Sequence, residues 1–341
     1  MATYKGIQGY SVQELASDPT SSENTGRLWY NSASNVWKIA SEGGGAWASG
    51  VSFTRVVTTD GKFSGTSTAT LFAGGYAPAG VHSPPLSMDY TETFDGTSWT
   101  EVADLNTPRY AAWMAGTQTA SVYAGGQITA PSALSETWNG TSWTETNNMQ
   151  NSRHNMGIAG TQTSGLAIAG LDGTPTGDCE DYDGTCWGTG TGINSARYSA
   201  GSAGASSTSA IFAGGADGST YYNILSETWN GTTWTEGNNI NTGRYALGGF
   251  GIVTSALICA GYKASGSPRS ANETETYDGT SWTAAATMGT ARYSPGATGG
   301  PGGISTGIIG GGNGSPTPSG LTQECEEWAD PTYTLKTVTT S

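Results

Sequence analysis

Positive charge is scarce in this sequence of 341 residues. Lys and Arg total 13 against 27 Asp and Glu, which gives a formal net charge of −14. Proteins that follow the phosphates of nucleic acid need clustered Lys and Arg. The thin spread of positive charge therefore argues against a nucleic-acid partner, and equally against an anionic membrane surface.

Long apolar segments and helical patterns are also missing. No apolar run reaches the 18 residues that suggest a membrane-spanning helix, and residues 1–20 lack the apolar stretch of a secretory signal. We therefore expect neither membrane insertion nor a signal peptide. Residues 10–17 are the only segment whose pattern fits a short helix.

Residues that support metal or redox chemistry are few. The two histidines, His82 and His154, fall in different parts of the chain and cannot form a three-histidine metal site. The four cysteines show no C-x-x-C spacing, and we expect them to be free thiols. The sequence thus predicts no metal site and no other cofactor. The cysteines are Cys179, Cys186, Cys259 and Cys325.

Glycine is abundant, with 53 residues, and so are aromatic residues, with 12 Trp and 16 Tyr. This blend is typical of short aromatic strands joined by tight turns. The sequence is organised as a repeat, because the segment Glu-x-aromatic-Asp/Asn-Gly-Thr-x-Trp occurs five times. An arginine follows the last tryptophan of each copy by ten positions. The tryptophans are Trp99, Trp143, Trp187, Trp234 and Trp282, and the arginines are Arg109, Arg153, Arg197, Arg244 and Arg292.

A second repeated feature raises the number of units to six. Apolar runs that end in glycine lie at 71–75, 122–126, 167–170, 211–215, 258–261 and 308–312. For the sixth unit we assign Glu326, Trp328 and Tyr333 to the positions of the repeated Glu, aromatic residue and Trp. Arg55 lies near the start of the first unit. Six units therefore run from about residue 51 to residue 339.

Each unit is expected to form four strands, since Asp-Gly or Asn-Gly between the last two is a strong signal for a tight hairpin. A four-stranded repeat of this length matches one propeller blade. The double glycine after the second strand, the aromatic residue on the third and the Trp on the fourth resemble the kelch repeat. The resemblance implies an all-β propeller with kelch-like blades, six by the count of units. Whether a hairpin near the N-terminus adds a seventh blade is open. Because all four strands of a unit are consecutive, we expect no interlocking strand that closes the ring.

The repeated Arg and Glu residues point to structure rather than to catalysis. Because every unit carries one of each, we predict that they pair within the frame of the fold, the guanidinium binding carboxylate or carbonyl oxygens. His154 occupies the position that Tyr110, Tyr198, Tyr245 and Tyr293 hold in other units, which favours packing over metal binding. We predict no catalytic residues, so the chain is not expected to be an enzyme.

The segments between the second and third strands differ most in length. From the Ala that precedes the glycines to the next repeated Glu there are 19, 12, 11, 14 and 15 residues in the first five units. Antiparallel order places these loops on one face of the ring, and such a face is commonly the binding face. Tyrosines there would stack on sugars or anchor a protein, although packing on adjacent blades is an alternative. The candidate ligand or partner residues are Tyr76, His82, Tyr221, Tyr222, Tyr262, Lys263 and Arg269.

Residues 1–50 do not follow the repeat. Within them, GRLWYNSASNVWKIA at 26–40 predicts a small aromatic hairpin. With the preceding ELASDPT it resembles the N-terminal piece of bacteriophage fibre and virion proteins, and the ETWNGTSWTE repeats resemble fibre-like proteins of marine phages. The resemblance implies that 1–50 attach the chain to other virion proteins or to sister chains through Trp29, Tyr30 and Trp37. Residues 51–341 would then be a displayed propeller, on a virion assembled in the host cytoplasm.

Three functions are open on this basis. The first is a non-enzymatic virion structural protein, like a tail or head fibre, for host-surface adhesion or particle decoration. The second is a lectin-like propeller that binds glycans. The third, with the least support, is a glycan-cleaving enzyme that uses carboxylates from distant loops. The sequence does not identify a receptor, whether host-surface glycan or protein, and does not decide whether the chain forms homo-oligomers.

Overall fold

The computed structural model describes residues 13–15, 28–42, 45–54, 60–77, 86–265, 269–299, 303–314, 323–330 and 333–338. All regular elements in these ranges are β-strands. No helix among the described residues is long and apolar enough to span a membrane. The chain divides into two compact units, one formed by Ala46–Ala329 and the other by Met1–Gly45 together with Asp330–Ser341.

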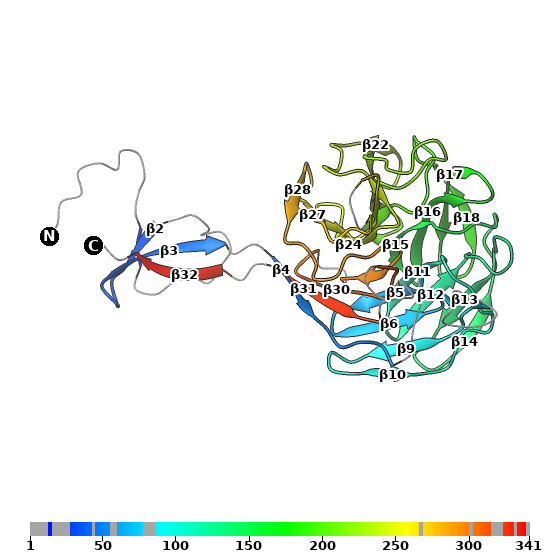
Figure 1. The fold of residues 1–341 in the computed structure, drawn as a ribbon, viewed down its shortest axis with the longest axis horizontal. Helices are drawn as coiled ribbons and strands as arrows, with labels where there is room; N and C mark the ends of the chain where they lie inside the picture. Colours follow the sequence, from blue (N-terminus) through cyan, green and yellow to red (C-terminus); the bar gives the residue numbers. More distant parts are fainter. Residues whose placement is uncertain are drawn as a thin grey trace. The chain divides into compact units, whose positions relative to one another are not determined.

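The larger unit is a six-bladed β-propeller of four-stranded antiparallel blades, as the sequence predicts (Figure 1). The innermost strands contact one another around a closed ring, the sixth contacting the first. The strands of each blade are given from the innermost to the outermost. The first blade is β5 (Lys62–Thr66), β6 (Ala69–Ala73), β9 (Thr91–Phe94) and β10 (Trp99–Glu101), and the second is β11 (Trp113–Thr117), β12 (Ala120–Ala124), β13 (Ser135–Trp138) and β14 (Trp143–Thr146). The third blade is β15 (Gly157–Thr161), β16 (Ser164–Leu171), β17 (Pro175–Tyr182) and β18 (Trp187–Gly190), and the fourth is β19 (Gly201–Ser206), β20 (Ser209–Ala213), β21 (Ser226–Trp229) and β22 (Trp234–Glu236). The fifth blade is β24 (Gly248–Ile252), β25 (Ser255–Cys259), β27 (Thr274–Tyr277) and β28 (Trp282–Ala285), and the sixth is β29 (Gly296–Thr298), β30 (Thr306–Gly310), β31 (Cys325–Ala329) and β4 (Ala46–Ser49).

The outer hairpin of each blade forms where the sequence has its Asp-Gly or Asn-Gly. In the first blade, the Asp95 carboxylate accepts hydrogen bonds from the backbone N–H groups of Thr97 (2.9 Å) and Ser98 (2.8 Å). Gly96 has a φ of 91°, a conformation that glycine adopts without steric cost. The hydrogen bond from the Thr97 hydroxyl (2.7 Å), together with these two backbone bonds, lowers the pKa of Asp95 to about 2. The local turn chemistry thus fixes the register of the third and fourth strands.

The hydrophobic core lies between neighbouring blades rather than within one blade. The cluster between the first two blades, for example, joins Leu71 of β6 to Met114, Tyr123 and Trp143 of the second blade. The indole N–H of Trp143 also donates to the Thr91 hydroxyl of the first blade (3.1 Å). Since apolar burial is the main favourable term in folding, each blade is stable only against its neighbours.

The sixth blade differs from the prediction. Its outermost strand is β4, residues 46–49, which pairs antiparallel with β31, so the start of the propeller sequence completes the last blade. Trp47 lies opposite Trp328 and donates its indole N–H to the Thr274 hydroxyl of the fifth blade (2.9 Å). This bond is equivalent to the one from Trp143 to Thr91 between the first two blades. The expectation that no strand interlocks the ring was therefore wrong, and Trp47, not Tyr333, is the tryptophan of this blade. The sequence carries a matching signal, because the apolar residue Phe53 follows Trp47 by six positions, as Leu105 follows Trp99.

The predicted Arg–Glu pairing is confirmed in five blades. In the fourth, the Arg197 guanidinium lies 2.5 Å from the Glu227 carboxylate and also donates to the carbonyls of Ser195, Phe212 and Gly214 at 2.9 to 3.1 Å. The other Glu227 oxygen accepts the backbone N–H of Asn194 (2.8 Å). The pair therefore ties the connection entering a blade to that blade's third strand. The other pairs are Arg109–Glu136, Arg153–Glu180, Arg244–Glu275 and Arg292–Glu326, all with arginine side chains fully buried. Arg55, the counterpart expected for the first blade, is outside the described residues.

A closed circle of backbone hydrogen bonds surrounds the propeller axis, just before the innermost strands. One residue per blade donates its N–H to the carbonyl of the equivalent residue in the preceding blade, at distances of 2.7 to 3.0 Å. All six have φ between 52° and 64° although none is glycine. Such a conformation costs free energy for residues with a Cβ atom, so the circle persists because the blades hold it. The residues are Asp60, Ala111, Asn155, Ser199, Ala246 and Ser294.

The smaller unit is one four-stranded sheet in the order β1 (Gln13–Leu15), β2 (Leu28–Asn31), β3 (Val36–Glu42) and β32 (Tyr333–Val338). The predicted hairpin is present as β2 and β3, with Asn31 opposite Val36. Residues 13–15 form a strand parallel to β2, not part of a helix, because they pair along its free edge. β32 pairs with β3 (Figure 1), so Tyr333 belongs to this sheet and not to the sixth blade.

Candidate binding face

The loops between the second and third strands meet the connections between blades on one face, which we call the loop face. The residue after each repeated Arg forms a backbone bridge to the residue that follows the second-strand glycines. Tyr110 bridges to Gln127 and Tyr198 bridges to Ala216, for instance. Tyr245 pairs in the same way with Tyr262, as β23 (Arg244–Tyr245) and β26 (Tyr262–Lys263). The loop face therefore brings the variable loops beside the repeated tyrosines.

Five tyrosines from the fourth, fifth and sixth blades gather on this face, and we call them the tyrosine patch. The ring centroid of Tyr245 lies 5.8 Å from that of Tyr221, 6.2 Å from that of Tyr222 and 5.7 Å from that of Tyr262. Tyr262 is in turn 5.2 Å from Tyr293 in an edge-on contact. The predicted residues Tyr221, Tyr222 and Tyr262 thus lie together, around a tyrosine of the repeat.

Tyr76 lies in a separate pair on the loop face. Its ring centroid is 4.9 Å from that of Tyr110, and the loop is held by the short strands β7 (Tyr76–Ala77) and β8 (Leu86–Ser87). His82, predicted as a site residue on this loop, is outside the described residues. The structure therefore does not add Tyr76 to the tyrosine patch.

Exposed apolar side chains are concentrated on the same face. Tyr221 is 50% exposed, and Ile224 from the same loop is 42% exposed. Ile128, on the corresponding loop of the second blade, is 37% exposed. Of the four large hydrophobic side chains that are exposed in the described residues, three therefore belong to these loops. Exposed apolar groups with polar surroundings are typical of interaction sites.

The loop that carries Tyr221 and Tyr222 is held by a carboxylate. Asp217 accepts hydrogen bonds from the backbone N–H groups of Thr220 (2.5 Å) and Ser219 (2.9 Å). The Asn223 amide donates to its other oxygen (3.3 Å). These bonds lower the pKa of Asp217. A loop ordered before binding loses less conformational entropy when it meets a ligand.

Two hydroxyl groups of the patch, those of Tyr245 and Tyr293, are held in their protonated form. Burial, together with the neighbouring tyrosines, raises the pKa of Tyr245 to about 12, and burial also raises the pKa of Tyr293. Each of these two rings therefore offers an apolar face and an O–H group that can donate or accept a hydrogen bond. Such a surface suits ligands that combine apolar C–H faces with hydroxyls, as sugars do.

The two basic residues predicted for this face have different surroundings. The Lys263 amine pairs with the Glu273 carboxylate at 2.5 Å, and the Lys263 backbone N–H donates to the Arg269 carbonyl (2.9 Å). Arg269 itself is exposed. Lys263 is thus engaged in an ion pair at the edge of the patch, whereas the Arg269 side chain faces solvent.

The predicted attachment residues lie in the smaller unit. Trp29 is 2% exposed, and the Tyr30 hydroxyl donates to Asn35 (3.1 Å) at the turn of the hairpin. Trp37 pairs through its backbone with Tyr30 and Val338. The Trp29 ring is therefore already covered within the chain.

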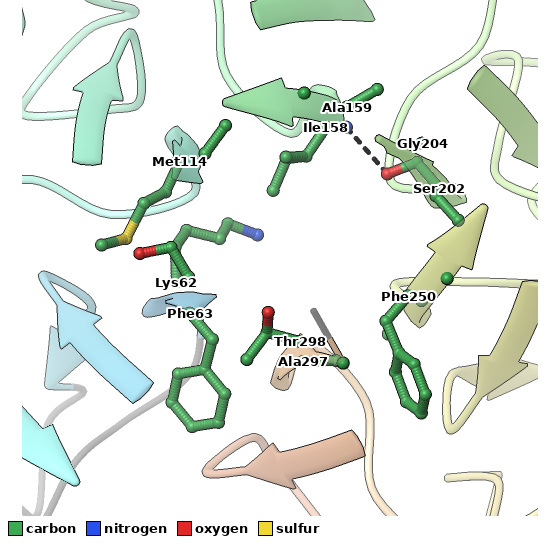
Figure 2. A pocket seen from close by; sticks show the side chains of 18 of the residues that line it. Lys62, Phe63, Met114, Ile158, Ala159, Ser202, Gly204, Phe250, Ala297 and Thr298 are labelled. Atoms are coloured by element: carbon green, nitrogen blue, oxygen red, sulfur yellow. Dashed lines mark hydrogen bonds between the residues drawn. The ribbon is translucent and has the colours of Figure 1, made fainter. Parts of the chain in front are cut away.

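A cavity that the sequence analysis did not predict lies on the propeller axis (Figure 2). This axial cavity has a volume of about 170 Å³ and is lined by the innermost strands of all six blades, mostly by Gly, Ala, Ser and Thr. Lys62 is the only charged side chain among its described lining residues. The available signal in the sequence was Lys62 at the first position of an innermost strand.

Groups for metal or thiol chemistry are dispersed. No three His, Cys, Asp or Glu side chains come together as a metal site in the part of the chain that the structure describes. All four cysteines are free, and burial raises the pKa of Cys179 to about 11 and that of Cys259 and Cys325 to about 12. His154 is buried, which lowers its pKa, and lies 3.0 Å from the Asn155 amide.

The chain matches no protein-family model, and no curated protein matches it in sequence.

Proposed function

We propose that this protein is a non-enzymatic adhesion protein that binds a host-surface glycan through the tyrosine patch. The observation that carries the proposal is the gathering of Tyr221, Tyr222, Tyr245, Tyr262 and Tyr293 on loops of three blades. Aromatic rings that are partly exposed on loops held by the fold are elements that suit sugar recognition.

The proposal includes a place for the protein in a virion, as a fibre-like component. Its support is the resemblance of residues 14–40 and of the kelch-like repeats to phage fibre and virion proteins. The smaller unit would provide attachment to other virion proteins, because it is a compact sheet separate from the propeller and formed by β1, β2, β3 and β32. In this arrangement the smaller unit attaches the protein to the particle, and the propeller presents the tyrosine patch to the host surface.

A glycan array probed with the full chain tests the binding part. We expect selective binding to a small set of glycans, and loss of that binding in Tyr221→Ala combined with Tyr262→Ala. Tyr76→Ala is the matched control, since Tyr76 lies on the same face outside the patch. Binding that survives the double substitution, or no binding to any glycan, would contradict the proposal.

Incorporation into particles tests the virion part separately. The variant should lack both 1–45 and 330–341, because these segments form one sheet, and should keep β4, which completes the sixth blade. We expect it to bind glycans but to be absent from purified particles. If it binds glycans and the full chain is also absent from particles, the alternative of a free lectin is favoured.

A further inference from the structure

We infer that the axial cavity is a binding site for a small carboxylate, with Lys62 as the group that neutralises its charge. The inference is independent of the tyrosine patch. It rests on an amine that points into the axial cavity, the composition of the cavity, and the position that Lys62 takes in the repeat.

The position is occupied by lysine in one blade only. Lys62 is the first residue of β5, and the first residue of the innermost strand is tryptophan in the second blade and glycine in the other four. Larger residues do not fit at these glycine positions without a shift of their neighbours. A Cβ atom at Gly157 would lie 2.5 Å from the Phe212 side chain, and one at Gly201 would lie 2.6 Å from the Ile258 side chain. The propeller fold therefore needs no amine at this position.

The Lys62 amino group has no partner within the described residues. No ion pair or hydrogen bond to it is formed there, in contrast to Lys263, which has Glu273. Figure 2 shows the Lys62 side chain passing Met114 and ending toward the middle of the cavity. Burial lowers the pKa of Lys62, and the charge of Asp60 opposes that shift. An uncompensated amine in such a place is unfavourable, and an anion beside it would offset the cost.

The rest of the cavity fits a small carboxylate. On β19, across the ring from β5, the Ser202 hydroxyl accepts the Ile158 N–H (2.7 Å), which leaves its own proton free to donate into the cavity. A volume of about 170 Å³ corresponds to roughly six water molecules at about 30 Å³ each. The small side chains of β15, β19 and β24 leave that space open. The ligand would be either a free small acid or the acidic sugar at the end of a glycan.

Lysine side-chain NMR of the full chain tests this inference. The sequence contains five lysines, so the ¹³Cε signals of a ¹³C-lysine-labelled sample can be assigned, with Lys62→Met identifying that of Lys62. The probes are sodium acetate and sodium glucuronate, with acetamide, glucose and sodium chloride as matched controls. We expect both carboxylates to shift the Lys62 signal saturably and to raise its titration midpoint, because an adjacent anion favours the protonated amine.

The outcomes separate the two sources and the competing explanation. Tighter binding of glucuronate indicates an acidic sugar, and saturation by acetate alone indicates a small free acid. An equal response to chloride, or no response to either carboxylate, would overturn the inference. Lys62→Met should weaken carboxylate binding by at least about tenfold, as expected for loss of a charged hydrogen bond, whereas Lys263→Met should leave it unchanged. Because the patch variant Tyr221→Ala leaves the cavity intact, failure of glycan adhesion would not change this result.

Discussion

The buried frame and the loop face of the propeller follow opposite rules. The frame repeats the same residues in nearly every blade, with arginines such as Arg197 fully buried against glutamates such as Glu227. The loop face differs from blade to blade, and its tyrosines gather over only three blades. Repetition therefore marks what each blade needs in order to fold, whereas asymmetry marks where one ligand could be recognised.

The largest effect on stability should come from breaking the frame. Arg197→Ala leaves the Glu227 carboxylate buried without its partner, and loss of one member of a buried pair costs about 3–5 kcal/mol. Denaturant unfolding monitored by tryptophan fluorescence measures this. The surface pair provides the control, because Lys263→Ala should cost at most about 1 kcal/mol. Equal costs for the two substitutions would show that the frame is not what holds the blades.

Removal of the closing tryptophan should have the next largest effect. Trp47→Ala deletes the aromatic contact with Trp328 and the hydrogen bond to Thr274. Since Trp47 is only partly buried, we expect a cost of about 2–4 kcal/mol, at or below the range for buried aromatic residues. Trp47→Phe, measured in the same unfolding experiment, should retain most of the stability. A negligible effect of Trp47→Ala would contradict the closure by β4.

The circle of left-handed residues allows a stabilising substitution. Ala246→Gly should raise the free energy of unfolding by up to about 1 kcal/mol, because its φ of 57° is unfavourable for a residue with a Cβ atom. Ala120→Gly in β12 is the matched control and should lower stability by about 0.5–1 kcal/mol, since glycine weakens a strand. If both substitutions destabilise equally, the circle is not under backbone strain.

The smallest effect on stability is expected on the loop face. Tyr221→Ala should change the free energy of unfolding by about 0.5 kcal/mol or less, because half of the side chain is already exposed. The same variant should lose glycan binding, which the array measures. A large destabilisation would mean that Tyr221 packs as part of the frame, and the patch would then need another explanation.

The sequence predicts the repeated parts of the fold well, because their signals are local. The Asp-Gly and Asn-Gly turns fix the outer hairpins, and the constant Trp-to-Arg spacing reflects the Arg–Glu pairs. The closure by β4 was missed because residues 46–49 and 325–329 are far apart in the chain and only tertiary pairing brings them together. The spacing of six between Trp47 and Phe53 was the available signal.

The candidate site was predicted only in part, for a similar reason. Tyr221, Tyr222 and Tyr262 were identified from loop length, whereas Tyr245 and Tyr293 were noted only as repeat residues at the position that His154 takes in another unit. Their ring contacts show that repeated residues also build the patch. Lys62 was missed because the cavity it faces exists only when six innermost strands close around the axis.

Hydroxyl-radical footprinting of the full chain, with and without the glycan selected on the array, tests the central claim most directly. We predict that the glycan protects Tyr221, Tyr222 and Tyr262 from oxidation and leaves Tyr76 and Tyr30 unchanged. Protection of residues on the outer strands instead, or no protection of the patch at a saturating glycan concentration, would contradict the assignment of the loop face as the binding surface.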